Sequence, residues 1–214
     1  MDLKNLIKIS FLSLIIGLSI PSQISAKEKS MSKQVVAIVD IKAKWYYFDF
    51  LLKNGFRNSI PEYEAAPGLL FKYYDFIHKD SQKEFGGIYL WKDIESAEKW
   101  YDDAWFDRIK EKRGSDPKLT IYQVEEIKTF VLDNFDYRII EGDSIAAYFP
   151  QISESKIEIF LTKAPGILRS YILKKDQKNY AVVLFENKDS AEEFILNHNL
   201  IGAELYSTPV LLKN

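Results

Sequence analysis

The sequence predicts an α+β fold in which two ferredoxin-like repeats, each ordered β-α-β-β-α-β, follow one another in a single chain. The main observation is that the chain carries the same pattern twice. Residues 66–70 read Ala-Pro-Gly-Leu-Leu, and residues 164–168, which lie 98 positions later, read Ala-Pro-Gly-Ile-Leu. Each motif leads to a helix start, Glu-Ser-Ala-Glu at 95–98 and Asp-Ser-Ala-Glu at 189–192. A unit of this length is too long for a solenoid repeat and has the size of a small domain duplicated in tandem.

Composition supports a fold with its own core. The chain has 214 residues, no cysteine and 14% aromatic residues. A protein without disulfides depends on a buried core, and this length is sufficient for one large or two small domains. The formal net charge of −2 and the lack of a basic stripe argue against a nucleic-acid partner. Aromatic residues fill cores by default, so their number alone does not indicate a ligand site.

Residues 1–26 have the pattern of a secretory signal peptide. Lys4 and Lys8 precede an apolar segment from 9 to 20, and the small residue Ala26 ends the region. The apolar segment is shorter than the roughly 18–20 residues that a membrane-spanning helix needs. We therefore expect an exported protein, periplasmic or secreted, with no stable membrane anchoring once the signal is cleaved near Ala26.

The first repeat is expected over residues 34–128 and begins with a strand and a helix. A β-branched run predicts a strand over 34–42. Apolar residues at mixed helical spacing predict a helix over 45–56 that ends near Gly55. Residues 60–66 are then expected to be a connection.

A hairpin, a second helix and a fourth strand complete the first repeat. Apolar runs predict strands over 68–77 and 85–91, joined by a polar loop that contains His78. The next helix is predicted to start at an Asp93 N-cap, to run to the basic residues before Gly114, and to carry one apolar face. That face is formed by Ala97, Trp100, Tyr101, Ala104 and Trp105. Residues 119–127 are the predicted fourth strand.

The second repeat, expected over residues 143–214, has the same order after a linker over 129–142. Strands are predicted over 144–149, 167–174, 180–186 and 204–212. Helices are predicted over 153–163 and over 189–198, the latter behind an Asn187 cap.

A combination of motifs in the first repeat resembles a known family. Residues 67–68 are Pro-Gly, Lys72 follows, residues 86–91 read Gly-Gly-Ile-Tyr-Leu-Trp, and the Ala97/Trp100/Tyr101 helix comes next. This combination, between about residues 37 and 127, resembles the YdhR-like monooxygenases. They are a branch of the antibiotic-biosynthesis-monooxygenase, or dimeric α/β-barrel, superfamily.

The second repeat is divergent and matches the superfamily by pattern alone. Residues 180–183 read Tyr-Ala-Val-Val in place of Gly-Gly-Ile-Tyr, and Arg169 stands beside the position that corresponds to Lys72. Superfamily members are typically single repeats that pair as dimers. The resemblance therefore implies that this chain forms an intramolecular pseudo-dimer, a dimeric α/β-barrel-like structure within one chain.

The resemblance also implies a function. Studied members of the superfamily use a pocket between sheet and helices, and some oxidise anthrone or quinol-type substrates with oxygen and without a metal or flavin. It therefore implies a cofactor-independent monooxygenase that acts on a small aromatic or quinol-like molecule. Such chemistry requires a proton acceptor and an apolar pocket that excludes water.

Six residues of the first repeat are candidates for this site. Lys72 and Tyr74 share one face of their strand, and Tyr89 and Trp91 share one face of the next. Which face meets the helices stays open, because both faces are apolar. The candidate catalytic residues, as proton acceptor or orienting group, are Tyr89 and Lys72. The candidate substrate-binding residues are Tyr74, Trp91, Trp100 and Trp105.

Alternatives remain for both the residues and the function. The tryptophans are also typical core residues, and Lys72 could lie at a sheet edge or between the halves. The second functional hypothesis is a non-catalytic exported binding module for a small hydrophobic ligand. The sequence leaves open whether two chains pair as a homodimer.

No metal site or hydrolase site is expected. His78 and His198 lack a second ligand at metal-binding spacing, and no Ser/His/Asp or Cys/His arrangement exists. Gly86 and Gly87 enter a strand rather than a helix, so they indicate a bulge or a close approach by Trp100 instead of an anion site.

Overall fold

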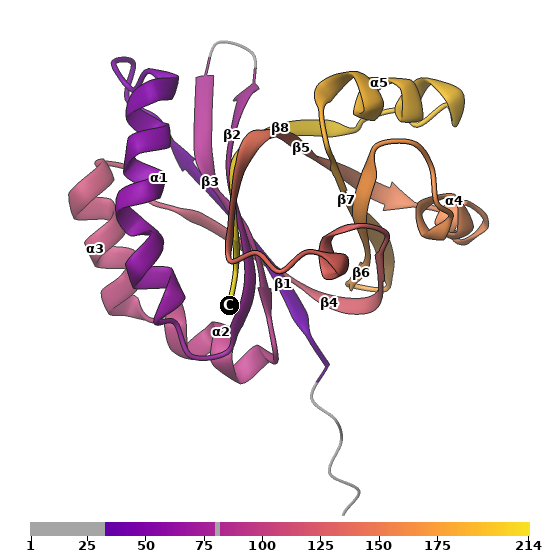
Figure 1. Ribbon diagram of the computed structural model, residues 1–214. Helices are drawn as coiled ribbons and strands as arrows, with labels where there is room; N and C mark the ends of the chain where they lie inside the picture. The colour runs from indigo at the N-terminus through magenta and orange to yellow at the C-terminus, as the bar shows by residue number, and fades with distance from the viewer. Residues whose placement is uncertain (1–32, 80–81) are drawn as a thin grey trace, which may run out of the picture. The chain divides into compact units, whose positions relative to one another are not determined.

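The computed structural model of the chain describes residues 33–79 and 82–214 (Figure 1). The expected signal peptide over residues 1–26 lies outside these residues. Within them, eight antiparallel strands form one closed barrel in the order β1-β3-β2-β8-β5-β7-β6-β4. The strands are β1 (Val35–Lys42), β2 (Leu69–Lys79), β3 (Gln82–Trp91), β4 (Lys118–Thr129), β5 (Ile139–Ile152), β6 (Ile167–Lys175), β7 (Lys178–Phe185) and β8 (Glu204–Lys213).

Helices cover the outside of the barrel in two groups, α1 to α3 on one side and α4 and α5 on the other (Figure 1). The helices are α1 (Asp49–Glu64), α2 (Ile94–Trp100), α3 (Asp103–Arg113), α4 (Ile157–Leu161) and α5 (Lys188–Asn197), with short 3₁₀ turns η1 (Leu132–Asn134) and η2 (Glu154–Lys156). No helix in the described ranges combines the length and the apolar character needed to cross a membrane.

The barrel has the internal two-fold pattern that a duplicated fold requires. Exchanging β1 to β4 with β5 to β8 leaves the circular strand order unchanged, and each half contributes one edge to each inter-half pairing, β2 with β8 and β4 with β6. Inside the barrel, the hydroxyls of Tyr73 and Tyr171 share a hydrogen bond across 98 residues, the interval between the two Ala-Pro-Gly motifs. Equivalent residues therefore meet at the centre. The predicted fold class, two tandem ferredoxin-like repeats forming a dimeric α/β-barrel-like pseudo-dimer, is confirmed.

Three apolar cores hold this arrangement together. One core fills the barrel interior, with Tyr73, Ile88, Leu90 and Leu184 among its members. A second lies between α1 to α3 and the outer face of the first-half strands, and the third lies under α4 and α5. The structure therefore settles which strand face meets the helices. Tyr74, Tyr89 and Trp91 lie on the outer face, under α1 to α3, and Tyr73, Ile88 and Leu90 lie inside the barrel.

Helix α1 differs from its prediction. It begins at Asp49 instead of residue 45, passes through Gly55 and continues to Glu64, so residues 60–64 are helical and not a connection. The buried residues recur every three or four positions, as Leu52, Phe56, Ile60 and Tyr63. Their burial against the sheet outweighs the helix-breaking tendency of Gly55 and Pro61.

The single helix predicted from Asp93 is in fact two helices. Asp93 caps α2 as predicted, because its Oδ1 accepts a hydrogen bond of 2.8 Å from the Ser96 N–H. The chain then breaks at Tyr101, and Asp102 caps α3 by accepting a bond of 2.8 Å from the Trp105 N–H. A second capping aspartate in mid-pattern explains the break.

Two local expectations around the hairpin are wrong. His78 lies in β2, paired with Lys83, because both hairpin strands extend further than their apolar runs. The close neighbour of Gly86 is not Trp100 but the backbone of β1, since a Cβ on Gly86 would stand 1.8 Å from the Val39 carbonyl oxygen. Glycine is required there by strand proximity.

The chain between the two halves is short and partly structured. Strand β4 runs to Thr129 and β5 starts at Ile139, so the expected linker over 129–142 contains η1 and the first residues of β5. Those residues pair with the end of β8, as in Ile139 opposite Leu212.

Candidate functional site

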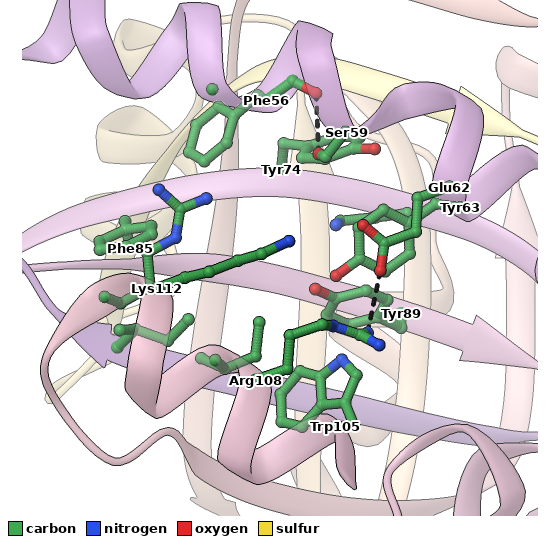
Figure 2. A pocket seen from close by; sticks show the side chains of 16 residues that line it. Phe56, Ser59, Glu62, Tyr63, Tyr74, Phe85, Tyr89, Trp105, Arg108 and Lys112 are labelled. Atoms are coloured by element: carbon green, nitrogen blue, oxygen red, sulfur yellow. Dashed lines mark hydrogen bonds and ion pairs between the residues drawn. The ribbon is translucent and has the colours of Figure 1, made fainter.

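A cavity of about 70 Å³ lies between α1, α3 and the outer face of β2 and β3 (Figure 2). We call it the lysine cavity. Its lining comes from four elements in the main: Phe56, Ser59, Glu62 and Tyr63 from α1, Lys72 and Tyr74 from β2, Phe85, Gly86 and Tyr89 from β3, and Trp105, Arg108, Ile109, Lys112 and Arg113 from α3, with Ile41 and Gly55 completing it.

Strand alternation and register bring the central residues together. Lys72 and Tyr74 are two apart on β2 and point to the same face, and Lys72 stands opposite Tyr89 in the ladder between β2 and β3. The helix α1 places Tyr63 over this pair. Trp105 and Arg108, one turn apart on α3, close the other side (Figure 2).

Lys72 is the most unusual residue of the cavity. Its side chain is 2% exposed, and its Nζ lies 3.0 Å, 3.8 Å and 4.7 Å from the ring centroids of Tyr63, Tyr74 and Tyr89. No hydrogen bond or ion pair holds Nζ among the described residues. Burial moves the pKa of Lys72 well below its usual value, and Arg113 acts in the same direction, while Glu62 and Asp75 oppose the shift. This shift favours the neutral form of the amine in comparison with an exposed lysine.

The tyrosines of the cavity have the opposite character. Burial raises the pKa of Tyr89 well above its usual value, and it also raises the pKa of Tyr63. Both phenols therefore keep their protons near neutral pH and are hydrogen-bond donors rather than bases. Their rings are 5.6 Å apart, and their hydroxyls point toward one another (Figure 2).

Two further polar groups of the lining lack a partner. The Tyr74 hydroxyl and the Trp105 Nε1 are buried and make no hydrogen bond among the described residues. An unpaired buried donor costs about 1–3 kcal/mol unless a ligand or water satisfies it.

The charge of the lining is predominantly positive. Lys72, Arg108, Lys112 and Arg113 face one carboxylate, Glu62, and that carboxylate accepts a hydrogen bond of 3.0 Å from Arg108 (Figure 2). An anion that forms in the cavity lies near Arg108, Lys112 and Arg113, and the carboxylate of the lining, Glu62, is already paired with Arg108.

A second, apolar cavity of about 200 Å³ adjoins the first. It is lined by Tyr47, Leu51, Leu52, Gly55, Phe56, Phe85 and Arg113, and the last four of these also line the lysine cavity. The two cavities therefore share Gly55, Phe56, Phe85 and Arg113 as a common wall. The apolar cavity is the larger of the two.

Four of the six candidate residues line the lysine cavity and two do not. Lys72, Tyr74, Tyr89 and Trp105 are in its wall. Trp91 and Trp100 lie beside it and pack on one another, with ring centroids 6.0 Å apart.

Sequence reasoning missed the contributions of α1 and the cationic face of α3. Tyr63 and Glu62 fell in a segment expected to be a connection. On α3, Trp105, Arg108 and Lys112 recur at helical spacing, and this pattern was the available signal for a mixed aromatic and cationic wall.

The second half does not repeat this lining. At the repeat offsets of 98 and 94, Lys72, Tyr74 and Tyr89 correspond to Ser170, Ile172 and Val183. Helix α5 is followed by β8, so α3 has no counterpart in the second half. No group of three or more His, Cys, Asp or Glu residues in the described part of the chain could hold a metal ion.

The barrel and its helix-covered outer faces define a class of protein: a tandem ferredoxin-like α/β barrel closed within one chain. Solved structures of the same fold exist. The chain is similar to a "putative monooxygenase" from Fusobacterium nucleatum subsp. nucleatum, with a TM-score of 0.60 and 12% identity over 86% of this chain and 95% of that one.

Two further structures match with lower scores. One is a "putative monooxygenase" from Lactobacillus acidophilus, with a TM-score of 0.51 and 11% identity over 85% of this chain and 97% of that one. The other is an anthrone oxidase-like protein, with a TM-score of 0.51 and 12% identity over 85% of this chain and 94% of that one. Neither a protein-family model nor a curated protein sequence matches the chain. At these identities the similarity shows the fold alone.

Proposed function

We propose that this protein is a cofactor-independent monooxygenase that oxidises a small aromatic or quinol-like molecule in the lysine cavity. The observation that carries the proposal is the Lys72 amine, buried and without a hydrogen-bond partner among the described residues, in a cationic cavity. The names of the structures with this fold agree with such chemistry.

Lys72 acts first, as the general base. Its neutral amine takes a proton from an acidic C–H or O–H group of the substrate, and the new ammonium lies over the rings of Tyr63, Tyr74 and Tyr89. The substrate anion faces Arg108, Lys112 and the donor hydroxyl of Tyr89, which disperse its charge.

Oxygen then reacts with the electron-rich anion. For an anthrone-type CH₂ group, the carbanion adds O₂, the peroxide anion recovers the proton from Lys72, and loss of water leaves a C=O group. The balance is one CH₂ and one O₂ to one C=O and one H₂O, so the substrate supplies every electron. The apolar walls, Phe56 and Trp105 among them, keep bulk water from the anion.

Oxygen uptake tests the proposal. The chain is supplied with a panel of anthrones and hydroquinones in the presence of a chelator, and ¹⁸O₂ is used to follow incorporation into the product. We expect uptake above autoxidation, one labelled oxygen atom per product, and a loss of about 10²- to 10⁴-fold in Lys72→Met. Lys128→Met, at an exposed position of β4, is the matched control.

A Tyr89→Phe variant distinguishes the role of Lys72 as general base from the role of Tyr89 as hydrogen-bond donor. Because Tyr89 keeps its proton, its removal should lower the rate by about ten- to a hundredfold without abolishing it. If oxygen uptake is equal in wild type, Lys72→Met and Tyr89→Phe, the lysine cavity takes no part in the reaction.

The second candidate is a non-catalytic exported binding module for a small hydrophobic ligand. It is favoured by the size of the apolar cavity, about 200 Å³ against 70 Å³ for the lysine cavity. Tight binding of aromatic compounds, seen by tryptophan fluorescence, together with no oxygen uptake across the panel, would decide for it.

A further inference from the structure

A short exposed segment at the start of α1 is unusually rich in large apolar side chains. Residues 45–51, which we call the aromatic segment, read Trp-Tyr-Tyr-Phe-Asp-Phe-Leu. Trp45 is 90% exposed, Phe50 62% and Phe48 56%, and Tyr46 and Leu51 are exposed as well. Contiguous exposure of this kind is characteristic of a docking surface, whereas single exposed apolar residues are ordinary.

The aromatic segment leads directly to the cavities. Tyr47 and Leu51 belong to the segment and line the apolar cavity. A chain of ring contacts runs inward from Trp45 to Tyr46 at 5.5 Å, from Tyr46 to Tyr47 at 5.2 Å, and from Tyr47 to Phe85 at 5.9 Å. Phe85 lies in the wall shared with the lysine cavity.

The charges around the segment are mainly positive. Lys42 and Lys44 are exposed just before it, and Lys53 is half-buried one turn into α1. Its own carboxylate, Asp49, is paired with Lys83. Within residues 33–79 and 82–214, no ion pair holds Lys42, Lys44 or Lys53, so the segment presents aromatic side chains beside lysines that have no carboxylate partner there.

We propose that the aromatic segment docks reversibly on a membrane surface that carries anionic lipid headgroups. Tryptophan and phenylalanine side chains insert at the level of the headgroups, and flanking lysines are attracted by the negative surface. A two-fold contact between two copies is the poorer fit, because it would bring the lysines of one copy close to those of the other.

Docking would place the apolar cavity at the lipid surface. An apolar substrate dissolved in the membrane would then pass Tyr47 and Leu51 without crossing bulk water. This entry route rests on the proposed function, whereas the docking itself does not.

Vesicle binding tests the docking. Because the barrel closes within residues 33–214, a chain that starts at Lys27 carries the complete fold and lacks the apolar residues 9–20. This chain is mixed with vesicles of phosphatidylcholine alone or with phosphatidylglycerol. Trp45 reports contact, since Trp91 and Trp105 are buried and Trp100 is half-buried. We expect co-sedimentation with the anionic vesicles, weaker at high salt, and quenching of Trp45 by brominated lipids.

Paired variants identify the surface. Phe48→Ser/Phe50→Ser keeps the Trp45 probe and should weaken vesicle binding at least about tenfold. Leu196→Ser/Ile201→Ser, at exposed positions of the second half, should bind as wild type. No binding to anionic vesicles, or equal weakening in both pairs, overturns the proposal. So does a concentration-dependent dimer that Phe48→Ser/Phe50→Ser abolishes while vesicles have no effect. Oxygen uptake is measured separately, so a failure here is distinct from a failure of the proposed function.

Discussion

Replacing Lys72 with methionine tests whether the buried amine is neutral in the folded protein. Methionine matches much of the lysine stem in shape and carries no charge. The structure sets two effects against each other. Burial lowers the pKa of Lys72, and three tyrosine rings with centroids at 3.0, 3.8 and 4.7 Å from Nζ favour the ammonium.

The sign of the pH dependence follows from the lowered pKa. Between that pKa and the value of about 10.4 in the unfolded chain, the unfolded state binds more protons than the folded state. The free energy of unfolding of the wild type therefore rises with pH in this window, by about 1.4 kcal/mol per pH unit. Lys72→Met has no titrating group at this position. The amount by which its free energy of unfolding exceeds that of the wild type should therefore shrink by the same figure per pH unit.

Urea unfolding at pH 7, 8, 9 and 10 measures this difference for wild type, Lys72→Met and the exposed control Lys128→Met. A difference between wild type and Lys72→Met that stays flat with pH would show that the rings hold the proton on Lys72. That result would refute its assignment as the base, whatever the activity of the variant.

Three further predictions concern other parts of the molecule. Gly55→Leu should keep the fold, because a Cβ at this position meets nothing within 4 Å. The leucine side chain should nevertheless weaken the binding of aromatic ligands about tenfold or more, because Gly55 lines both cavities. Titration calorimetry measures this effect, with Gly55→Ala as the control. Tyr73→Phe and Tyr171→Phe should each lower the free energy of unfolding, measured with denaturant, by about 1–3 kcal/mol, because each change leaves the other hydroxyl without this partner. The double variant should lose less than the sum of the two single losses, since it leaves neither hydroxyl unpaired. Burial raises the pKa of Asp40 to about 6. Between about pH 4 and pH 6 the folded state therefore binds more protons than the unfolded state, and the free energy of unfolding of the wild type falls as the pH rises through this window. Asp40→Asn should therefore melt at a higher temperature than wild type at pH 7 and lose this advantage near pH 4; equal pH profiles would contradict the assignment.

The strands and helix caps were predictable because their signals are local. The β-branched run of β1, the Asp93 cap of α2 and the Asn187 cap of α5 each act within a few residues. The end of α1 was not predictable in this way. Gly55 and Pro61 disfavour a helix locally, and only the sheet under Phe56 and Tyr63 reverses that preference.

The candidate site was predictable where it lies on the repeat motif. Lys72 and Tyr89 stand opposite one another because the hairpin register is set by neighbouring strands. Glu62 and Arg108 could not be placed with them, since their position depends on how α1 and α3 pack against the sheet. The helical spacing within each segment shows which side chains share a face, but it does not show that these two faces meet.

The closed strand order of a single chain has a consequence for stoichiometry. In a barrel assembled from two identical chains, a substitution appears twice and both sites change together. Here the two halves accumulate substitutions independently, and Ser170 and Val183 stand where the first half has Lys72 and Tyr89. One copy of the chain therefore offers one lysine cavity, and barrel closure does not depend on protein concentration. Ligand binding should saturate at one molecule per chain, without cooperativity between the halves.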